Sequence, residues 1–112
     1  MNKTGLDLDK ELRTNVKLLA SALESNKQRG KEYAQAERDY RVALRQLILL
    51  ERDKGTPVTI INDICRGDEA VAQLRFNRDV AEQRYKSSQE AINVYKTFIR
   101  VAENEIQRER GR

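Results

Sequence analysis

Several residue types on which enzymes and metal sites depend are scarce in this 112-residue chain. Histidine and tryptophan are absent, and there is one cysteine, Cys65. The lack of histidine removes the usual general base and the commonest metal ligand. A single cysteine cannot build a cysteine-rich zinc site or an intrachain disulfide. We therefore expect no catalytic site, no metal and no cofactor, and a protein that is not an enzyme.

Glycine and proline are also rare, which favours long uninterrupted helices. The chain has one proline, Pro57, and five glycines, none of them in a phosphate-binding array. Neither residue occurs between Asp68 and Arg110, so nothing in that stretch breaks a helix.

Long apolar runs are missing as well. The longest extends only from Leu47 to Leu50, far too short to cross a bilayer. The first residues, MNKTGLDLDKELR, contain no apolar core of the kind that signal peptides have. We expect no membrane association and a cytoplasmic location.

Charge of both signs is abundant. Lys and Arg total 22 and Asp and Glu total 18, so that 36% of the chain is charged and the net charge is +4. Mixed signs are typical of solvated helical surfaces, whereas nucleic-acid binders more often gather basic residues in one patch. The segment 74–85 combines arginine with aromatic residues and keeps nucleic-acid binding as the less favoured alternative.

An apolar heptad pattern predicts a long helix over residues 69–109. Positions three and four residues apart would form one stripe of this helix, which we call the seam. It comprises Val71, Leu74, Arg78, Ala81, Tyr85, Ser88, Ile92, Tyr95, Ile99, Ala102 and Ile106. Such a helix is stable only if this stripe is covered by another surface.

The rest of the chain predicts the helix that covers the seam. Residues 1–30 form an N-terminal helical segment, with Leu12, Val16, Leu19 and Leu23 expected on its inner side, and residues 31–54 form a helix. Gly30 leaves open whether these two are one continuous, weak helix or two helices with a break.

A compact connection predicts that the chain reverses direction after residue 54. Thr56 is expected to cap a short helix over residues 57–66, with Pro57 in its first position and Ile60, Ile61 and Ile64 closing the hairpin. Asp68 is expected to cap the last helix. The predicted fold is all-α, one domain over residues 1–112: a long helical hairpin, or antiparallel coiled coil, with a short connecting helix.

A second apolar stripe on the last helix predicts self-association. It comprises Phe76, Val80, Val94, Phe98 and Val101, which lie away from the seam. Two helices can cover only one narrow seam each, so we expect a homo-oligomer, most simply an antiparallel dimer that forms a four-helix bundle. The alternative is that the N-terminal segment of the same chain covers these residues.

Large polar and aromatic residues near the connection form a hypothetical surface for a different protein. They are Tyr33, Tyr40, Arg75, Arg78, Asp79 and Glu82. We expect them on an exposed polar face of the hairpin.

Several short motifs resemble a small, uncharacterised helical protein of phages and prophages of Gram-positive bacteria. They are AExxYxxAL at 36–44, GxPVT at 55–59, DxxxG at 63–67, VAxLRFxRDVAE at 71–82, AIN at 91–93 and the stretch 103–109. The resemblance implies a phage-encoded early protein that acts in the host cytoplasm. We expect its function to be that of a protein-binding module that modulates a host or phage protein. Inhibition of a host defence system such as CRISPR–Cas is one specific form. The alternative is a nucleic-acid-binding accessory factor in phage DNA replication or recombination.

Overall fold

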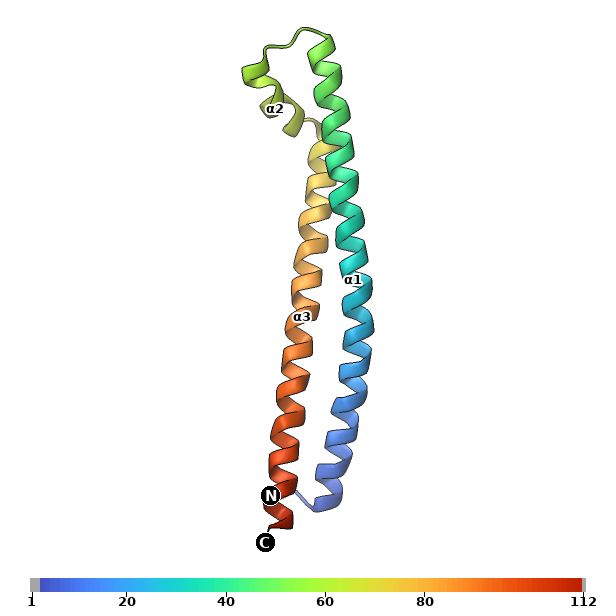
Figure 1. Cartoon of the computed structure of the whole chain (residues 1–112), viewed down its shortest axis with the longest axis vertical. Helices are drawn as coiled ribbons and strands as arrows, with labels where there is room; N and C mark the ends of the chain where they lie inside the picture. The colour runs from blue at the N-terminus through green and yellow to red at the C-terminus, as the bar shows by residue number, and fades with distance from the viewer. Residues whose placement is uncertain (1–2, 112) are drawn as a thin grey trace. The chain divides into compact units, whose positions relative to one another are not determined.

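The computed structural model describes residues 3–111, and it is all-α, as predicted. The first two residues and the last one, which belong to the predicted domain, lie outside the described part. Within the described part there are three helices, shown in Figure 1: α1 (Gly5–Asp53), α2 (Val58–Arg66) and α3 (Glu69–Arg110). The predicted helical hairpin with a short connecting helix is confirmed.

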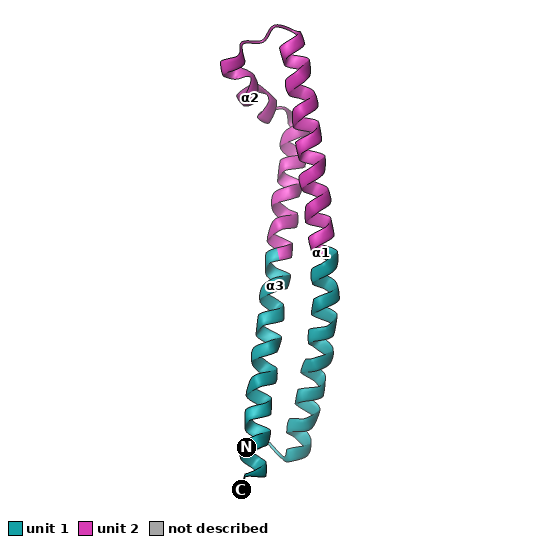
Figure 2. Cartoon of the chain, in the orientation of Figure 1, with its two compact units in different colours: residues 1–28, 86–112 teal, residues 29–85 magenta. Residues whose placement is uncertain are grey.

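The chain divides into two compact units, coloured separately in Figure 2. Unit 1 combines the residues up to Gln28 with those from Lys86 onward, and unit 2 is Arg29–Tyr85. In each unit a segment of α1 lies beside a segment of α3. The segments are antiparallel: in unit 1, for example, Asn26 contacts Ser88 while Leu6 lies near Ile106.

The start of α1 is set by a reciprocal pair of hydrogen bonds. The Asp7 amide donates to Thr4 Oγ1 (3.1 Å), and the Thr4 amide donates to Asp7 Oδ2 (3.3 Å). This capping box satisfies amides that the first helical turn leaves without backbone partners. This cap was not predicted from the sequence.

α1 runs through Gly30 without a break, which settles the question left open by the sequence. A Cβ at Gly30 would lie 3.3 Å from Cε1 of Tyr85 in unit 2. Glycine therefore leaves room for the Tyr85 ring, which also faces the Tyr33 ring at a centroid distance of 6.1 Å. The helix accepts a residue of low helix propensity because a neighbouring aromatic ring occupies the space.

α1 ends in a Schellman motif centred on Gly55. Gly55 has a φ of +83°, its amide donates to the Arg52 carbonyl, and the Thr56 amide donates to the Glu51 carbonyl. These bonds satisfy the last carbonyls of the helix, and the left-handed conformation reverses the chain. Gly55 therefore has the capping role that its position predicts.

The predicted cap of α2 was wrong. Thr56 does not cap this helix; its hydroxyl donates to Glu51 Oε2 at 2.7 Å, on the preceding helix. Pro57 is the cap residue rather than the first helical one, since its ψ of 134° is extended, and α2 has no side-chain cap. The threonine hydroxyl is already used in closing α1.

Only one side of α2 packs against the hairpin. Ile61 and Cys65 are buried, and Cys65 is wholly inaccessible. Ile60 and Ile64, which were also expected to close the hairpin, are exposed because α2 turns that side outward. The cap of α3 is as predicted: the Val71 amide donates to Asp68 Oδ2 at 3.1 Å.

The predicted α3 seam is confirmed at every position. All eleven residues are buried or half-buried, with Val71, Ile92 and Ala102 the most covered. The seam continues through both units along one helix.

The predicted inner side of α1 in unit 1 was partly wrong. Leu12 and Leu19 face inward, but Val16 and Leu23 are exposed. The inward positions are Leu8, Leu12, Asn15, Leu19, Ala22 and Asn26. These positions share one heptad register with the inward positions in the later part of α1. Heptad spacing rather than apolarity therefore decides which residues face α3.

Candidate functional site

The predicted partner surface near the connection divides into internal and exposed residues. Tyr40 is only 6% exposed, and Tyr33 is half-buried against Tyr85. Arg78 is half-buried, with its guanidinium carbon 4.7 Å from the centroid of the Tyr40 ring. At this distance the cation interacts favourably with the face of the ring. The expectation of an exposed face is therefore corrected for Tyr33, Tyr40 and Arg78.

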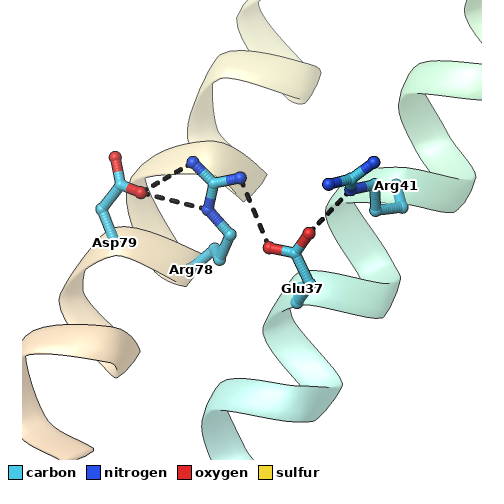
Figure 3. A network of polar contacts seen from close by, with 4 residues as sticks. All are labelled: Glu37, Arg41, Arg78 and Asp79. Atoms are coloured by element: carbon cyan, nitrogen blue, oxygen red, sulfur yellow. Dashed lines mark hydrogen bonds and ion pairs between the residues drawn. The ribbon is translucent and has the colours of Figure 1, made fainter. Parts of the chain in front are cut away.

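Arg78 is the centre of a polar network within unit 2, shown in Figure 3. It donates to Asp79 Oδ1 from Nε (3.1 Å) and Nη2 (2.8 Å), and Nη1 donates to Glu37 Oε2 at 3.3 Å. The other Glu37 oxygen accepts from Arg41 Nε at 2.7 Å. The network links the two facing helices.

These contacts favour the charged forms of both groups. The Arg41 hydrogen bond, followed by the charges of Arg78 and Arg41, holds the pKa of Glu37 below its usual value. Hydrogen bonding to Asp79, with the charges of Asp79 and Glu37, raises the pKa of Arg78. An arginine can therefore occupy a seam position because its charge is matched from both sides.

The remaining predicted partner residues stay closer to solvent. Arg75 and Asp79 are exposed and Glu82 is half-buried. Beside them, the side chain of Phe76 is 61% exposed, and Val80 is exposed one turn later. We call Arg75, Phe76, Asp79 and Val80 the Phe76 surface. It lies on the side of α3 away from the seam.

The second predicted stripe is exposed, but its residues belong to different units. Phe76 and Val80 lie in unit 2, whereas Val94, Phe98 and Val101 lie in unit 1. They are therefore two surfaces, and each is considered by itself. The alternative, that the N-terminal segment covers Val94, Phe98 and Val101, is wrong, because all three remain exposed beside it.

Unit 1 contains an open groove that was not foreseen. It has a volume of about 250 Å³ and is lined by small residues and two larger ones: Leu18, Ser21, Ala22, Ser25, Ser88, Ala91 and Tyr95. At its floor Ser88 Oγ donates to Asn26 Oδ1 at 3.1 Å, between the two helices. The ring of Phe98 is edge-on to that of Tyr95, which lines the groove, at a centroid distance of 6.4 Å.

Two parallel stripes without charge flank this groove. Positions four and three apart place Thr14, Leu18, Ser21, Ser25 and Gln28 on one side of α1. The same spacing places Ser87, Ala91, Val94, Phe98 and Val101 on one side of α3. Four of these ten residues line the groove, so both stripes lie on the groove side of unit 1. We call these two stripes and the groove the groove face.

The spacing of small residues is the feature of the sequence from which this groove could have been predicted. Ser21 and Ser25 are one turn apart, and Ser88 and Ala91 are almost one turn apart on the other helix. The sequence shows each pair, but only the register of α1 against α3 places them at the same level.

In residues 3–111 no three or more cysteine, aspartate or glutamate side chains gather as a metal site would require. No helix there has both the length and the apolar character needed to cross a membrane. Each buried side-chain nitrogen or oxygen in the described part has a hydrogen-bond partner.

Comparison of the chain with protein-family models, with curated protein sequences and with solved structures gave no match.

Proposed function

We propose that this chain is a non-enzymatic, phage-encoded protein-binding module. It acts in the host cytoplasm as an early protein and modulates a host or phage protein. Inhibition of a host defence system such as CRISPR–Cas is the specific form that can be assayed directly. The phage origin rests on the sequence motifs given above, and the binding role rests on the exposed surfaces of the helices.

The observation that carries the proposal is the exposure of Phe76. Its side chain is 61% exposed, with Val80 one turn further on the same side of the helix. Arg75 and Asp79 are also exposed beside this apolar pair. An aromatic residue surrounded by polar and charged groups is the usual composition of a binding hot spot and its rim.

A helix presents such a surface in a form that a partner groove can accept. Apolar residues four apart lie one above the other, as in helices that dock into hydrophobic grooves of other proteins. The Arg78 network holds α3 against α1 just behind Phe76, which limits the ordering cost of binding. The proposed contact residues are therefore Arg75, Phe76, Asp79 and Val80.

The nucleic-acid alternative receives less support from the same segment. Arg78 is engaged by Glu37 and Asp79, and Tyr85 packs against Tyr33, so neither is presented to a nucleic acid. Arg75 and Arg84 remain exposed. Binding through these two arginines alone would be weak, because few phosphate charges would be neutralised.

A capture experiment with matched variants tests the proposal. The tagged full chain is incubated with lysate of host cells at an early stage of phage infection, and retained proteins are identified by mass spectrometry. Phe76→Glu should lose the specific partner, whereas Asn104→Glu, which adds the same charge at an exposed position of α3 in unit 1, should keep it. Retention of the same proteins by all three chains would overturn the assignment of the Phe76 surface.

A second readout addresses the function itself. Expression of the chain in a host with an active CRISPR–Cas system should raise the survival of a targeted phage, and Phe76→Glu should abolish this gain. Retention of DNA on the immobilised chain at low salt, lost equally in Arg75→Ala and Arg84→Ala, would favour the nucleic-acid alternative instead.

A further inference from the structure

We propose that the groove face of unit 1 binds a second copy of this chain in antiparallel orientation, so that Phe98 of each copy packs on Ala91 of the other. The inference is independent of the Phe76 surface, which lies in unit 2. The proposed interface consists of the exposed stripe of α3, the groove and the stripe of α1. Together they form a surface that can pair with a copy of itself.

The absence of charge on the groove face is the first argument. None of its ten stripe residues is ionisable, in a chain of which 36% is charged. Nine of the ten are exposed, and Leu18, Val94, Phe98 and Val101 are large apolar residues among them. The opposite flank of α3 in unit 1 differs, because it carries the charged residues Lys96, Arg100 and Glu103. An exposed apolar area with a polar surround is typical of a protein-binding surface.

The distribution of large and small residues identifies a second copy as the occupant. A two-fold interface uses the same patch twice, so each protruding residue must meet a small one when the patch is reversed. Along α3, reversal about the midpoint between Val94 and Tyr95 brings Phe98 opposite Ala91 and Val101 opposite Ser88. Both of these pairs join a larger residue to a smaller one.

The same reversal works on α1. About the midpoint between Leu19 and Ala20, Leu18 comes opposite Ser21, and Thr14 comes opposite Ser25. Again no charge meets a charge, and the leucine meets the smaller serine.

A single two-fold axis satisfies both helices. Counting from the Asn26–Ser88 hydrogen bond, each midpoint lies between six and seven residues along its helix. The two midpoints are therefore at the same level of unit 1, within the groove that Leu18 and Tyr95 line. This coincidence is what an antiparallel dimer of hairpins requires, and a partner of different sequence would impose no such symmetry.

The size of the face sets the expected affinity. The stripes extend about 21 Å at 1.5 Å per residue, and two helices side by side are about 20 Å wide, which gives roughly 400 Å² of flat area per copy. Two copies together would bury about 800 Å², and the entry of Phe98 into the groove would add to this; stable interfaces usually exceed about 1,000 Å². We therefore expect a reversible dimer of micromolar affinity.

Sedimentation velocity of the full chain tests the dimer. Between about 1 and about 200 µM the mass should rise from the 13.0 kDa of one chain toward twice that value. Phe98→Lys and Ala91→Glu, each alone, should weaken dimerisation at least about tenfold, because a buried charge then lacks a partner. Asn104→Glu, at an exposed position outside the groove face, is the matched control and should leave the mass unchanged.

A charge pair tests the orientation. In the combined Phe98→Lys, Ala91→Glu variant, antiparallel docking places the two opposite charges together across the interface, so dimerisation should recover. Circular dichroism should show the same helix content in all variants, since the changed positions lie outside the seam. A chain that stays at 13.0 kDa at the highest concentration, single variants that still dimerise, or a combined variant without recovery would each overturn the proposal.

The outcome is separable from that of the proposed function. Loss of partner capture in Phe76→Glu with normal dimerisation would support both assignments. Loss of capture in Phe98→Lys as well would mean that the partner recognises the dimer.

Discussion

The guanidinium of Arg78 lies over the ring of Tyr40, with 4.7 Å between its central carbon and the ring centroid. The two residues come from facing helices of unit 2, and Tyr40 is buried beneath the arginine. Glu37 and Asp79 hold the arginine in this place from either side. A charged residue thus occupies the α3 seam as a structural element of the hairpin.

Replacing Arg78 should therefore destabilise the fold. We expect Arg78→Ala to lower the free energy of unfolding by about 2 kcal/mol, because it removes charge-assisted hydrogen bonds and the cover of the Tyr40 ring. Arg75→Ala, at the exposed neighbouring position, should change it by less than about 0.5 kcal/mol. Urea titrations followed by circular dichroism measure both; equal effects would contradict the structural role of Arg78.

The lowered pKa of Glu37 predicts a loss of stability in acid. Its ordinary value is 4.5, and folding lowers it, so the charged carboxylate stabilises the folded state above pH 4.5. That contribution should disappear as the pH falls through the lower folded pKa. Glu51, whose pKa is lowered chiefly by the Thr56 hydroxyl, acts in the same direction.

Glu37→Gln isolates the first of these two groups. Urea midpoints measured at several pH values from neutral down to about pH 3 should fall less steeply in this variant than in the wild type. Glu24→Gln, at a well-exposed ion pair with Lys27, serves as the control. An unchanged pH dependence in Glu37→Gln would show that the carboxylate does not couple to folding.

Gly30 and Tyr85 should show a coupled effect on stability. Alanine in a helix interior is more stable than glycine by about 1 kcal/mol. In the wild type the new methyl group would lie only 3.3 Å from the Tyr85 ring, so part of this gain is lost. In a Tyr85→Ala background, Gly30→Ala should give the whole gain. Additive free energies of unfolding in the four-variant cycle would exclude the contact.

Gly55 should be intolerant of a side chain for a different reason. Its φ of +83° is in the left-handed region, and a Cβ there has nothing within 4 Å. Gly55→Ala should therefore cost about 1–2 kcal/mol of stability through backbone strain alone. Gly5→Ala, also in open space but with an ordinary φ, should cause no loss. Thermal unfolding of the two variants makes the comparison.

Much of the fold could be predicted because the apolar pattern of the last helix is nearly complete. The α3 seam repeats without interruption from Val71 to Ile106, and Gly55 and Asp68 mark the helix ends by well-understood capping chemistry. The inner side of α1 was harder to predict. Val16 and Leu23 are more apolar than Asn15 and Ala22, yet the heptad register places the latter two inward.

The candidate sites were harder to predict from the sequence, because they depend on how α1 and α3 pair. Arg78 was placed correctly on the seam, but its three partners lie on two helices, so its internal role depends on the pairing of α1 with α3. The groove also arises from two segments that are distant along the chain. The exposure of Phe98, by contrast, was predictable from its own helix.

The burial of Cys65 provides a built-in probe of how the α2 end of the hairpin opens. The thiol is wholly covered, and burial raises its pKa, so in the closed state it should react very slowly with a thiol reagent. Because Cys65 is the single cysteine of the chain, each labelled molecule records one event in which α2 lifted from the hairpin end. When the reagent reacts faster than α2 recloses, the labelling rate at native pH reports how often this end opens, without an introduced probe.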